Sequence, residues 1–413
     1  MFMKVLCVFG QHNYGDPKRG EGYEYTNFIP ALRQLGHEVL FLESWNRACH
    51  RDFRELNKAL LRIVEQNHPD VVFSVLMNYE IWLETWEMLR DAGIAATVNW
   101  ATDDSWKYAQ FSRLVAPAFH AFTTTYPAIY ARYRRDGIPH VLLTQWAANA
   151  ANLQPPLPAD ECQYAVSFVG TAHGKRRSWI DALGRRGIEV ACFGHGWPHG
   201  PVAADNIPHI VRHSVISLNF ANSPTAWRIG PLRQTNQIKA RTFEAPGVGG
   251  FLLTEWADGL DQYYTPGQDI EVFYSLGELA DKIRYYLVHP AERDAIAQAG
   301  YERTCVEHTY DQRLTEMLDF ALRQREKHFA YQGVVPTGQI DWARFEEAAQ
   351  QHRDDIKLLM LKRGLVAICS TIWGPVRGPR AARRLVFELS WRLVGARTYS
   401  AAGWPGRMFY SVS

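Results

Sequence analysis

Residues 237–255, with the sequence QIKARTFEAPGVGGFLLTE, combine the residue types that hold a phosphorylated nucleoside. The pattern predicts a helix that runs into a strand, with Lys239 or Arg241 near Glu244 and a tight glycine-rich turn. A pyrophosphate needs positive charge and close backbone approach, and ribose hydroxyls need a carboxylate that accepts two hydrogen bonds. The alternative is an ordinary surface charge cluster at helical spacing. The residues of this segment that we assign to a nucleotide site are Lys239, Arg241, Glu244, Gly249 and Gly250.

Three polar residues near the start of the chain are candidates to exchange a proton with a bound hydroxyl group. Asp103 and Asp104 follow a predicted strand at 95–99, and His12 lies in the loop after a predicted strand at 5–9. A carboxylate or an imidazole at such a place can act as a general base. The alternatives are a loop-capping or acceptor-orienting role for the aspartates and simple exposure for the histidine. Adjacent aspartate side chains diverge and do not form the Asp-x-Asp pair that grips a metal, so we predict no metal site.

The elements that would position these residues alternate between strand and helix patterns. Such alternation predicts parallel sheets covered on both faces, with ligands at the carboxyl ends of the strands. Gly10, Gly170 and Gly194 each directly follow a predicted strand, and we assign Gly170 to the nucleotide site. The predicted strands lie at 5–9, 38–42, 70–76, 95–99, 121–125 and 140–144, and the pattern restarts at 164–169, 188–193 and 215–220.

The chain has the length and composition of two globular lobes with an appendage. It has 413 residues, of which 47% are hydrophobic and 21% charged. Residues 149–158 contain three prolines and little periodicity, so they are the best candidate for a linker. We therefore expect a first domain at 1–150, a second at 151–330 and a helical extension at 331–413, with the site in the cleft between the lobes.

Cysteine usage and the N-terminal sequence favour a cytoplasmic protein. The six cysteines are scattered without a C-x-x-C pair and are typical of reduced core thiols. The apolar run at 5–9 is much shorter than the hydrophobic region of a signal peptide, so we expect no export. We also expect no nucleic-acid partner.

Residues 215–318 resemble the C-terminal domain of spore-maturation CgeB-like proteins, a branch of the group-1 glycosyltransferases. The resemblance rests on LNFANS, QIKARTFEAPGVGGFLLTE, YTPGQDIEVFYSLGELADKIRYYLVHPAERDAIAQAGYERT and HTYDQRL. It implies a GT-B fold, in which two Rossmann-like domains face each other across a cleft, and a metal-independent, hexosyltransferase-like enzyme. It also implies that the nucleoside-diphosphate sugar is the donor substrate, that no cofactor is needed, and that the acceptor is a glycan or lipid-linked molecule of the cell envelope or of polysaccharide biosynthesis.

The resemblance also assigns roles to individual residues. The carboxylate that matches Glu244 holds the ribose in relatives, and basic residues near strand-end loops hold the pyrophosphate. Arg176 and Arg177, which follow SFVGTAHGK, match the second role by position, as do Lys239 and Arg241. The alternative for the two arginines is that they are solvated charges at the start of a helix.

One position departs from the pattern of the relatives. Retaining relatives often carry two glutamates separated by seven residues, but the position that precedes Glu244 by this spacing is Asn236. Asn236 or Gln237 can still form a hydrogen bond to a sugar hydroxyl, and both retention and inversion stay open. The alternative functions are a nucleotide-sugar epimerase and a non-catalytic nucleotide-sugar-binding protein of the same fold.

The last segment of the chain, 356–413, is strongly basic. It contains ten lysines and arginines and one acid, so it carries a formal charge of +9 and leaves the remainder of the +2 chain at −7. Apolar runs are interleaved with these charges, and none reaches the ~20 uninterrupted apolar residues of a membrane span, so we expect no spanning helix. Two interpretations stay open: peripheral binding to the anionic inner face of a membrane, and packing of the helices onto the acidic body.

Overall fold

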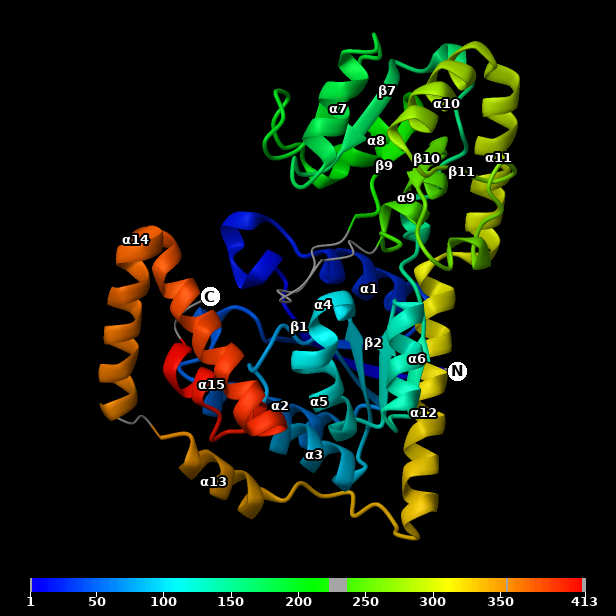
Figure 1. The fold of residues 1–413 in the computed structure, drawn as a ribbon. Coiled ribbons are helices and arrows are strands. Elements are labelled where there is room, and N and C mark those ends of the chain that lie inside the picture. Colours follow the sequence, from blue (N-terminus) through cyan, green and yellow to red (C-terminus); the bar gives the residue numbers. More distant parts are fainter. Residues whose placement is uncertain (1, 223–235, 354–355, 411–413) are drawn as a thin grey trace. The chain divides into compact units, whose positions relative to one another are not determined.

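The computed structural model describes residues 2–222, 236–353 and 356–410. The chain divides into two compact units (Figure 1). The first unit comprises Met1–Thr144 and Leu314–Ser413, and the second comprises Gln145–Arg313. We expected domain boundaries at 150 and 330 and a separate extension. The second unit instead ends at Arg313, and the helices that follow belong to the first unit.

The first unit is built on a six-stranded sheet with the strand order β2-β1-β3-β4-β5-β6. All its pairings are parallel; Val5, for example, is paired with Val39 on one side and with Val71 on the other. The central strands are buried on both faces, which is why they appear in the sequence as continuous apolar runs. The strands are β1 (Lys4–Phe9), β2 (Glu38–Glu43), β3 (Val71–Ser74), β4 (Ala96–Ala101), β5 (Ala121–Thr124) and β6 (Val141–Leu143).

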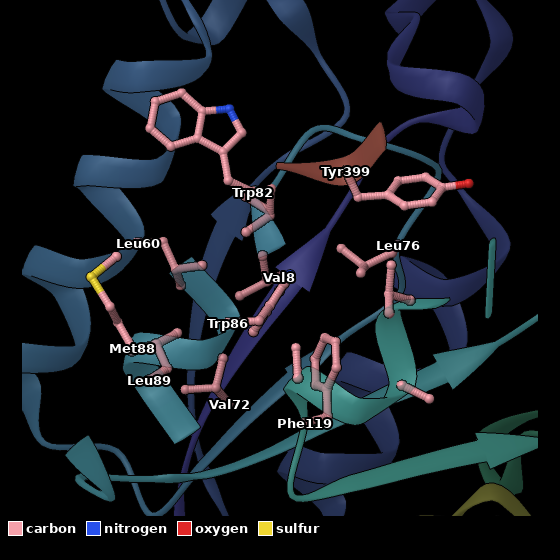
Figure 2. Packing of buried hydrophobic residues seen from close by; sticks show 14 of the residues in the cluster. Val8, Leu60, Val72, Leu76, Trp82, Trp86, Met88, Leu89, Phe119 and Tyr399 are labelled. Carbon is pink, nitrogen blue, oxygen red and sulfur yellow. The ribbon is translucent and has the colours of Figure 1, made fainter. Parts of the chain in front are cut away.

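Helices from both ends of the chain cover this sheet. Figure 2 shows part of its buried apolar cluster, in which Val8, Leu60 and Trp86 from the N-terminal part pack in one group with Tyr399. Phe387 also belongs to this cluster, so the basic tail is anchored in the core of the first unit. The helices are α1 (Tyr23–Gln34), α2 (Phe53–Asn67), α3 (Leu83–Ala92), α4 (Asp104–Lys107), α5 (Arg113–Val115), α6 (Pro127–Arg135), α13 (Trp342–Gln351), α14 (Ile356–Val394) and α15 (Trp404–Phe409), together with most of α12 (Tyr310–Gln332).

The second unit repeats the same architecture with a five-stranded sheet. The strand order is β11-β10-β9-β7-β8, and all pairings are parallel. The strand predicted at 188–193 is limited to Ala191–Phe193. The strands are β7 (Tyr164–Val169), β8 (Ala191–Phe193), β9 (Ser214–Asn219), β10 (Leu252–Glu255) and β11 (Glu271–Phe273), and the helices are α7 (Arg176–Gly184), α8 (Ile207–Arg212), α9 (Arg241–Gly247), α10 (Leu276–Val288) and α11 (Pro290–Glu307).

The prediction of an α/β fold with two Rossmann-like domains and a helical C-terminal region is confirmed. The expectation that no helix spans a membrane stays a prediction. The segment Lys357–Tyr399 is long and apolar enough to cross a membrane, by length and composition alone, and the apolar window in it is 6% buried.

Candidate functional site

Positively charged side chains gather at the carboxyl edge of the second sheet. The loop after β7 carries His173 and leads into α7, which begins at Arg176. The positive charges of Arg176 and Lys239 both lower the pKa of His173, although burial is the larger cause. Burial likewise lowers the pKa of Arg176, and the charge of Arg241 lowers it further. These mutual effects place the four side chains in one electrostatic cluster, which we call the cation cluster.

Arg176 lies at the centre of the cation cluster. Its guanidinium donates a hydrogen bond from Nη1 to the carbonyl oxygen of Thr171 at 3.1 Å and lies 5.5 Å from the centre of the Phe168 ring. Its Nε is buried and has no hydrogen-bond partner within the described part of the chain. The Oδ1 atom of Asn222, at the end of the segment that follows β9, is in the same situation. Buried polar atoms without partners are rare in proteins and indicate a place for a ligand or an ordered water.

Arg177 contacts the loop after β8. Its Nη2 donates a hydrogen bond to the carbonyl oxygen of Gly196, and its guanidinium lies 5.7 Å from the centre of the Trp197 ring. The sequence assigned both arginines to the pyrophosphate. The structure brings only Arg176 to the cation cluster, because consecutive residues at the start of a helix project in different directions.

Two charged residues of the site were not assigned from the sequence. The carboxylate of Glu255, the last residue of β10, is only 4% exposed and forms an ion pair with Nζ of Lys175. Its other oxygen accepts a hydrogen bond from the backbone N–H of Ala221 at 3.1 Å. Lys175 directly precedes Arg176, and Glu255 closes the segment from which the nucleotide site was predicted. The sequence could have indicated both residues by their positions, because Lys175 directly precedes a helix and Glu255 is the last residue of a strand.

Glu244 lies in the first turn of α9, where it meets Arg241. The Nε atom of Arg241 donates a hydrogen bond to Oε2 of Glu244 at 3.2 Å, and the two side chains are 20% and 29% exposed. The sequence predicted this proximity, and the pair has the i,i+3 spacing of an ordinary helical ion pair. It differs from a solvated surface pair because the charge of Arg241 also acts on Arg176.

The structure places the predicted glycines at opposite edges of the second sheet. Gly170 follows β7 directly, and a side chain there would approach Nη1 of Arg176 to 3.6 Å. Gly249 and Gly250 lie after the far end of α9, just before β10 begins. A side chain at Gly249 would meet the backbone of Pro155 and Pro156, and one at Gly250 would meet Val211. Assigning these two glycines to the pyrophosphate was therefore wrong, because they serve packing on the edge away from the cation cluster.

Asn236 is held by the strand ends of the second unit. Its Nδ2 donates a hydrogen bond to the carbonyl oxygen of Trp256 at 2.7 Å, and its backbone pairs with Asn222 in an isolated bridge. Asn236 therefore lies beside the residue whose Oδ1 is buried without a partner. Its assignment as a contact to the donor sugar stays a prediction.

The two aspartates predicted as bases have different surroundings in the first unit. Asp104 is 2% exposed and accepts hydrogen bonds from the hydroxyl groups of Ser112 and Tyr133, the latter at 3.0 Å. Burial raises its pKa to about 6, although these hydrogen bonds act in the opposite direction. The structure therefore encloses Asp104 in the first unit, and its assignment as a base stays a prediction. The side chain of Asp103 is 46% exposed and lies 3.6 Å from Nζ of Lys107.

A second carboxylate near Asp103 was missed from the sequence. Glu24, in the first turn of α1, has its pKa raised mainly by burial and further by the charge of Asp103, whereas Lys107 lowers it. The three side chains therefore share one site at the carboxyl edge of the first sheet. Nζ of Lys107 also donates a hydrogen bond to the carbonyl oxygen of Met77, in the segment after β3, at 3.3 Å.

His12 lies in the loop after β1, where its backbone bridges to Glu21. It is half-buried, and its ring makes no hydrogen bond to any residue that the structure describes. The assignment of His12 as a base stays a prediction. Within residues 2–222, 236–353 and 356–410, no group of three or more histidine, cysteine or acidic side chains is placed to hold a metal ion.

Comparisons with known proteins connect this geometry to a class of enzymes. Residues 175–319 match a family model described as glycosyl transferase-like. This segment contains all the residues of the cation cluster except His173, as well as Lys175, Glu244 and Glu255. A comparison of the sequence with curated proteins found no match.

Three solved structures share the fold over most of this chain. HepE from Anabaena, solved in complex with UDP, is 12% identical with a TM-score of 0.53, and the match covers 77% of this chain and 100% of HepE. Sucrose-phosphate synthase from Thermosynechococcus elongatus is 12% identical with a TM-score of 0.52, over 80% of this chain and 99% of the synthase. A glycosyltransferase from Rickettsia africae is 11% identical with a TM-score of 0.50, over 79% and 97%.

At these identities the likeness shows the fold, which is the GT-B fold of glycosyltransferases. The second unit in addition carries a glycosyl transferase-like segment. The narrower resemblance to CgeB-like proteins stays a prediction.

Proposed function

We propose that the protein transfers a glycosyl group, most simply a hexose, from a nucleoside-diphosphate sugar to an acceptor hydroxyl. The observation that supports this most strongly is the cation cluster in the glycosyl transferase-like segment. With Lys175 included, the described residues of the cluster supply four permanent cations, which face two carboxylates, Glu244 and Glu255. The excess of positive charge matches a pyrophosphate group, which carries about two negative charges.

In this proposal the residues of the second unit hold the donor. Arg176 and Arg241 contact the pyrophosphate, and Nε of Arg176 donates the hydrogen bond that it lacks in the protein alone. Glu244 accepts hydrogen bonds from the ribose hydroxyls, and Asn236 donates one to the sugar. Cations at this place also stabilise the negative charge that develops on the diphosphate as it leaves.

The first unit supplies the group that accepts a proton. The acceptor oxygen forms a bond to the anomeric carbon, the bond from that carbon to the diphosphate oxygen breaks, and the hydroxyl proton moves to a carboxylate. Asp103 is the carboxylate that we propose for this step, because it is exposed whereas Asp104 is enclosed. Glu24 adds negative charge beside it. His12 is the rival base.

The wider setting that we propose is cytoplasmic synthesis of a polysaccharide or cell-envelope glycan without a bound metal. The nucleobase of the donor can be identified by measuring the binding of different nucleotides. HepE, which shares the fold, was solved with UDP, so UDP and UDP-sugars are the first ligands to test.

The proposal is tested by comparing the binding of UDP and uridine in matched variants by titration calorimetry. We expect Arg176→Gln to weaken UDP binding about 10- to 100-fold and to leave uridine binding unchanged, because the lost hydrogen bonds are charge-assisted bonds to phosphate. Arg177→Gln is the matched control, since that side chain contacts the Gly196 loop. Equal effects of the two substitutions, or no effect of either, would contradict the assignment. If no uridine ligand binds, the same series is run with the other nucleoside diphosphates.

The alternative functions differ in their products. A transferase releases nucleoside diphosphate and needs an acceptor, an epimerase converts the sugar without an acceptor, and a binding protein leaves the sugar nucleotide intact. Incubation of the protein with the bound sugar nucleotide and analysis of the products therefore separates the three. Sugar epimerisation in the absence of acceptor would overturn the proposal.

A further inference from the structure

Helix α14 is a hairpin of two helical arms. Gly374 has a φ of 80° and a ψ of 165°, which breaks the helix, and Pro375 follows it. Figure 1 shows the orange ribbon of α14 folding back on itself at this place. The arms approach closely, because a side chain on Gly378 of the second arm would lie 2.6 Å from Cα of Ser370 on the first. A small buried cluster joins the arms to α15; its members are Cys369, Ala382, Val386, Met408 and Phe409.

The bend of this hairpin carries large apolar side chains that nothing covers in the described part of the chain. Ile368, Ile372, Trp373 and Val376 are 59%, 63%, 53% and 82% exposed. We call these four residues the apolar tip. Large apolar side chains that gather on an exposed surface indicate an interaction site, whereas single ones do not.

Basic residues border the apolar tip on both sides in the sequence. The stretch 364–376 contains no charged residue, with Lys362 and Arg363 before it and Arg377 and Arg380 after it. We call these four residues the basic collar. The nearest acid in the hairpin is Glu388, which already pairs with Arg392. An apolar surface flanked in the sequence by cations matches an anionic lipid bilayer, in which acyl chains lie behind phosphate groups.

The dimensions of the hairpin favour one leaflet over a complete span. Residues 364–373 form a helix about 15 Å long, which is about half of the ~30 Å hydrocarbon core. The second arm becomes basic at Arg377, directly after the bend, and Arg377, Arg380 and Arg384 are all exposed. Continued insertion of this arm would bury these guanidinium groups in hydrocarbon, which is costly. A second copy of the chain is a poorer occupant, because it would bring the same positive collar.

We propose that the α14 hairpin inserts its apolar tip into one leaflet of an anionic bilayer, with the basic collar among the headgroups. The C-terminal segment that carries the tip is anchored in the core of the first unit through Phe387 and Tyr399. Insertion would therefore hold the candidate acceptor-binding unit at the membrane, where lipid-linked acceptors are found. The membrane site itself does not depend on the nucleotide site, so the two proposals can fail separately.

Co-sedimentation with vesicles tests the proposal with the full chain. We expect binding to vesicles that contain phosphatidylglycerol and much weaker binding to pure phosphatidylcholine. The double substitution Ile372→Glu and Trp373→Glu should weaken binding about tenfold or more, since it removes two apolar groups from the bilayer. Arg377→Gln and Arg380→Gln should each weaken it about fivefold. Val335→Glu is the matched control, because Val335 is 87% exposed and lies outside the hairpin. The same thermal unfolding curve in all variants shows that each one folds.

Insertion is separated from surface attraction by lipids brominated at defined acyl positions, which quench tryptophan at contact. We expect quenching that is strongest at shallow positions and is reduced by Trp373→Phe, whereas Trp404→Phe on α15 is the control. Absence of vesicle binding, or binding that the glutamate substitutions do not weaken, would overturn the proposal. Strongest quenching at the bilayer centre would indicate a spanning helix and would also overturn it. Self-association that the glutamate substitutions abolish, without vesicle binding, would assign the tip to a contact between copies.

Discussion

The two sheets have similar parallel architecture, but their carboxyl edges carry opposite chemistry. The described residues at the edge of the second sheet include Lys175, Arg176 and Arg241, with fewer carboxylates than cations. At the edge of the first sheet, Asp103 and Glu24 both lie near the cation Lys107. Strand ends in such sheets are places where loops meet, so side chains can change there without a change of fold. Under the proposed function, one architecture would hold an anionic group in one unit and accept a proton in the other.

Two other carboxylates at the edge of the first sheet accept hydrogen bonds from backbone N–H groups. Glu43 accepts hydrogen bonds from the N–H groups of Gln11, Trp45 and Asn46. Glu80 is fully buried and accepts hydrogen bonds from two N–H groups of its own loop. These two side chains hold loops in place, whereas the side chain of Asp103 is 46% exposed.

The largest expected effect is that of Asp103→Asn on turnover. If Asp103 accepts the acceptor proton, the substitution should lower kcat about 100- to 1000-fold and leave donor binding unchanged. The measurement is steady-state kinetics with the donor and acceptor found by screening, together with donor titration. His12→Gln and Glu24→Gln are measured in parallel. If His12→Gln abolishes turnover and Asp103→Asn does not, the rival base is correct and the first unit's carboxylates have another role.

A smaller effect is expected for Glu244→Ala in the second unit. The loss of two charge-assisted hydrogen bonds to ribose should cost about 3 kcal/mol, or about 100-fold in donor affinity. Because Glu244 is half-exposed and α9 is anchored by buried Phe243, the variant should keep its fold. Calorimetry with nucleoside and nucleoside diphosphate should show the same loss for both ligands, in contrast to Arg176→Gln. Unchanged binding in a folded variant would leave Glu244 as an ordinary partner of Arg241.

The sequence predicted the two sheets because buried parallel strands are continuous apolar runs. It also predicted the proximity of Arg241 and Glu244, because helical spacing is a local property. Gly249 and Gly250 were misassigned, since the edge of the sheet on which a turn lies depends on where the helix before it ends. Asp103 and Asp104 are adjacent in the sequence, and only the packing of Ser112 and Tyr133 against Asp104 distinguishes them.

The missed residues have a common physical reason. Glu24 and Glu255 are far in the sequence from the residues that they join, and their signal is a tertiary contact. The same holds for the domain boundary at Arg313, since the helices that follow return to the first unit through long-range packing of residues such as Phe387 and Tyr399. Local patterns therefore predict elements and neighbouring charges, whereas tertiary packing selects which of them form a site.

The difference between the two neighbouring aspartates is measurable as a pH dependence of stability. The pKa of Asp104 is raised to about 6 in the folded protein from 3.8, so the folded state binds its proton more tightly. Its contribution to stability is therefore present at low pH and is lost as the pH rises through 6, by about 3 kcal/mol in all. Asp104→Asn removes this dependence. We expect chemical denaturation to show the variant gaining stability relative to the wild type between about pH 4 and about pH 7.5. A constant difference across this range would mean that Asp104 is not desolvated, and Asp103→Asn is the exposed control.

The smallest expected effect is that of a chelator on turnover. If the cation cluster and strand-end N–H groups neutralise the pyrophosphate, a divalent ion is not needed there. Turnover should then be unchanged in excess chelator, and added magnesium or manganese should not raise it.

A sharper form of this experiment uses Arg176→Gln and Arg241→Gln, in which positive charge has been removed. A divalent ion that partly restores donor binding in these variants, but has no effect on the wild type, would show that the arginines supply the charge that a metal could otherwise provide. Complete loss of wild-type turnover in chelator, restored by either metal, would contradict the proposed role of the cations at the edge of the second sheet. The difference in charge between the two edges would then have no demonstrated function.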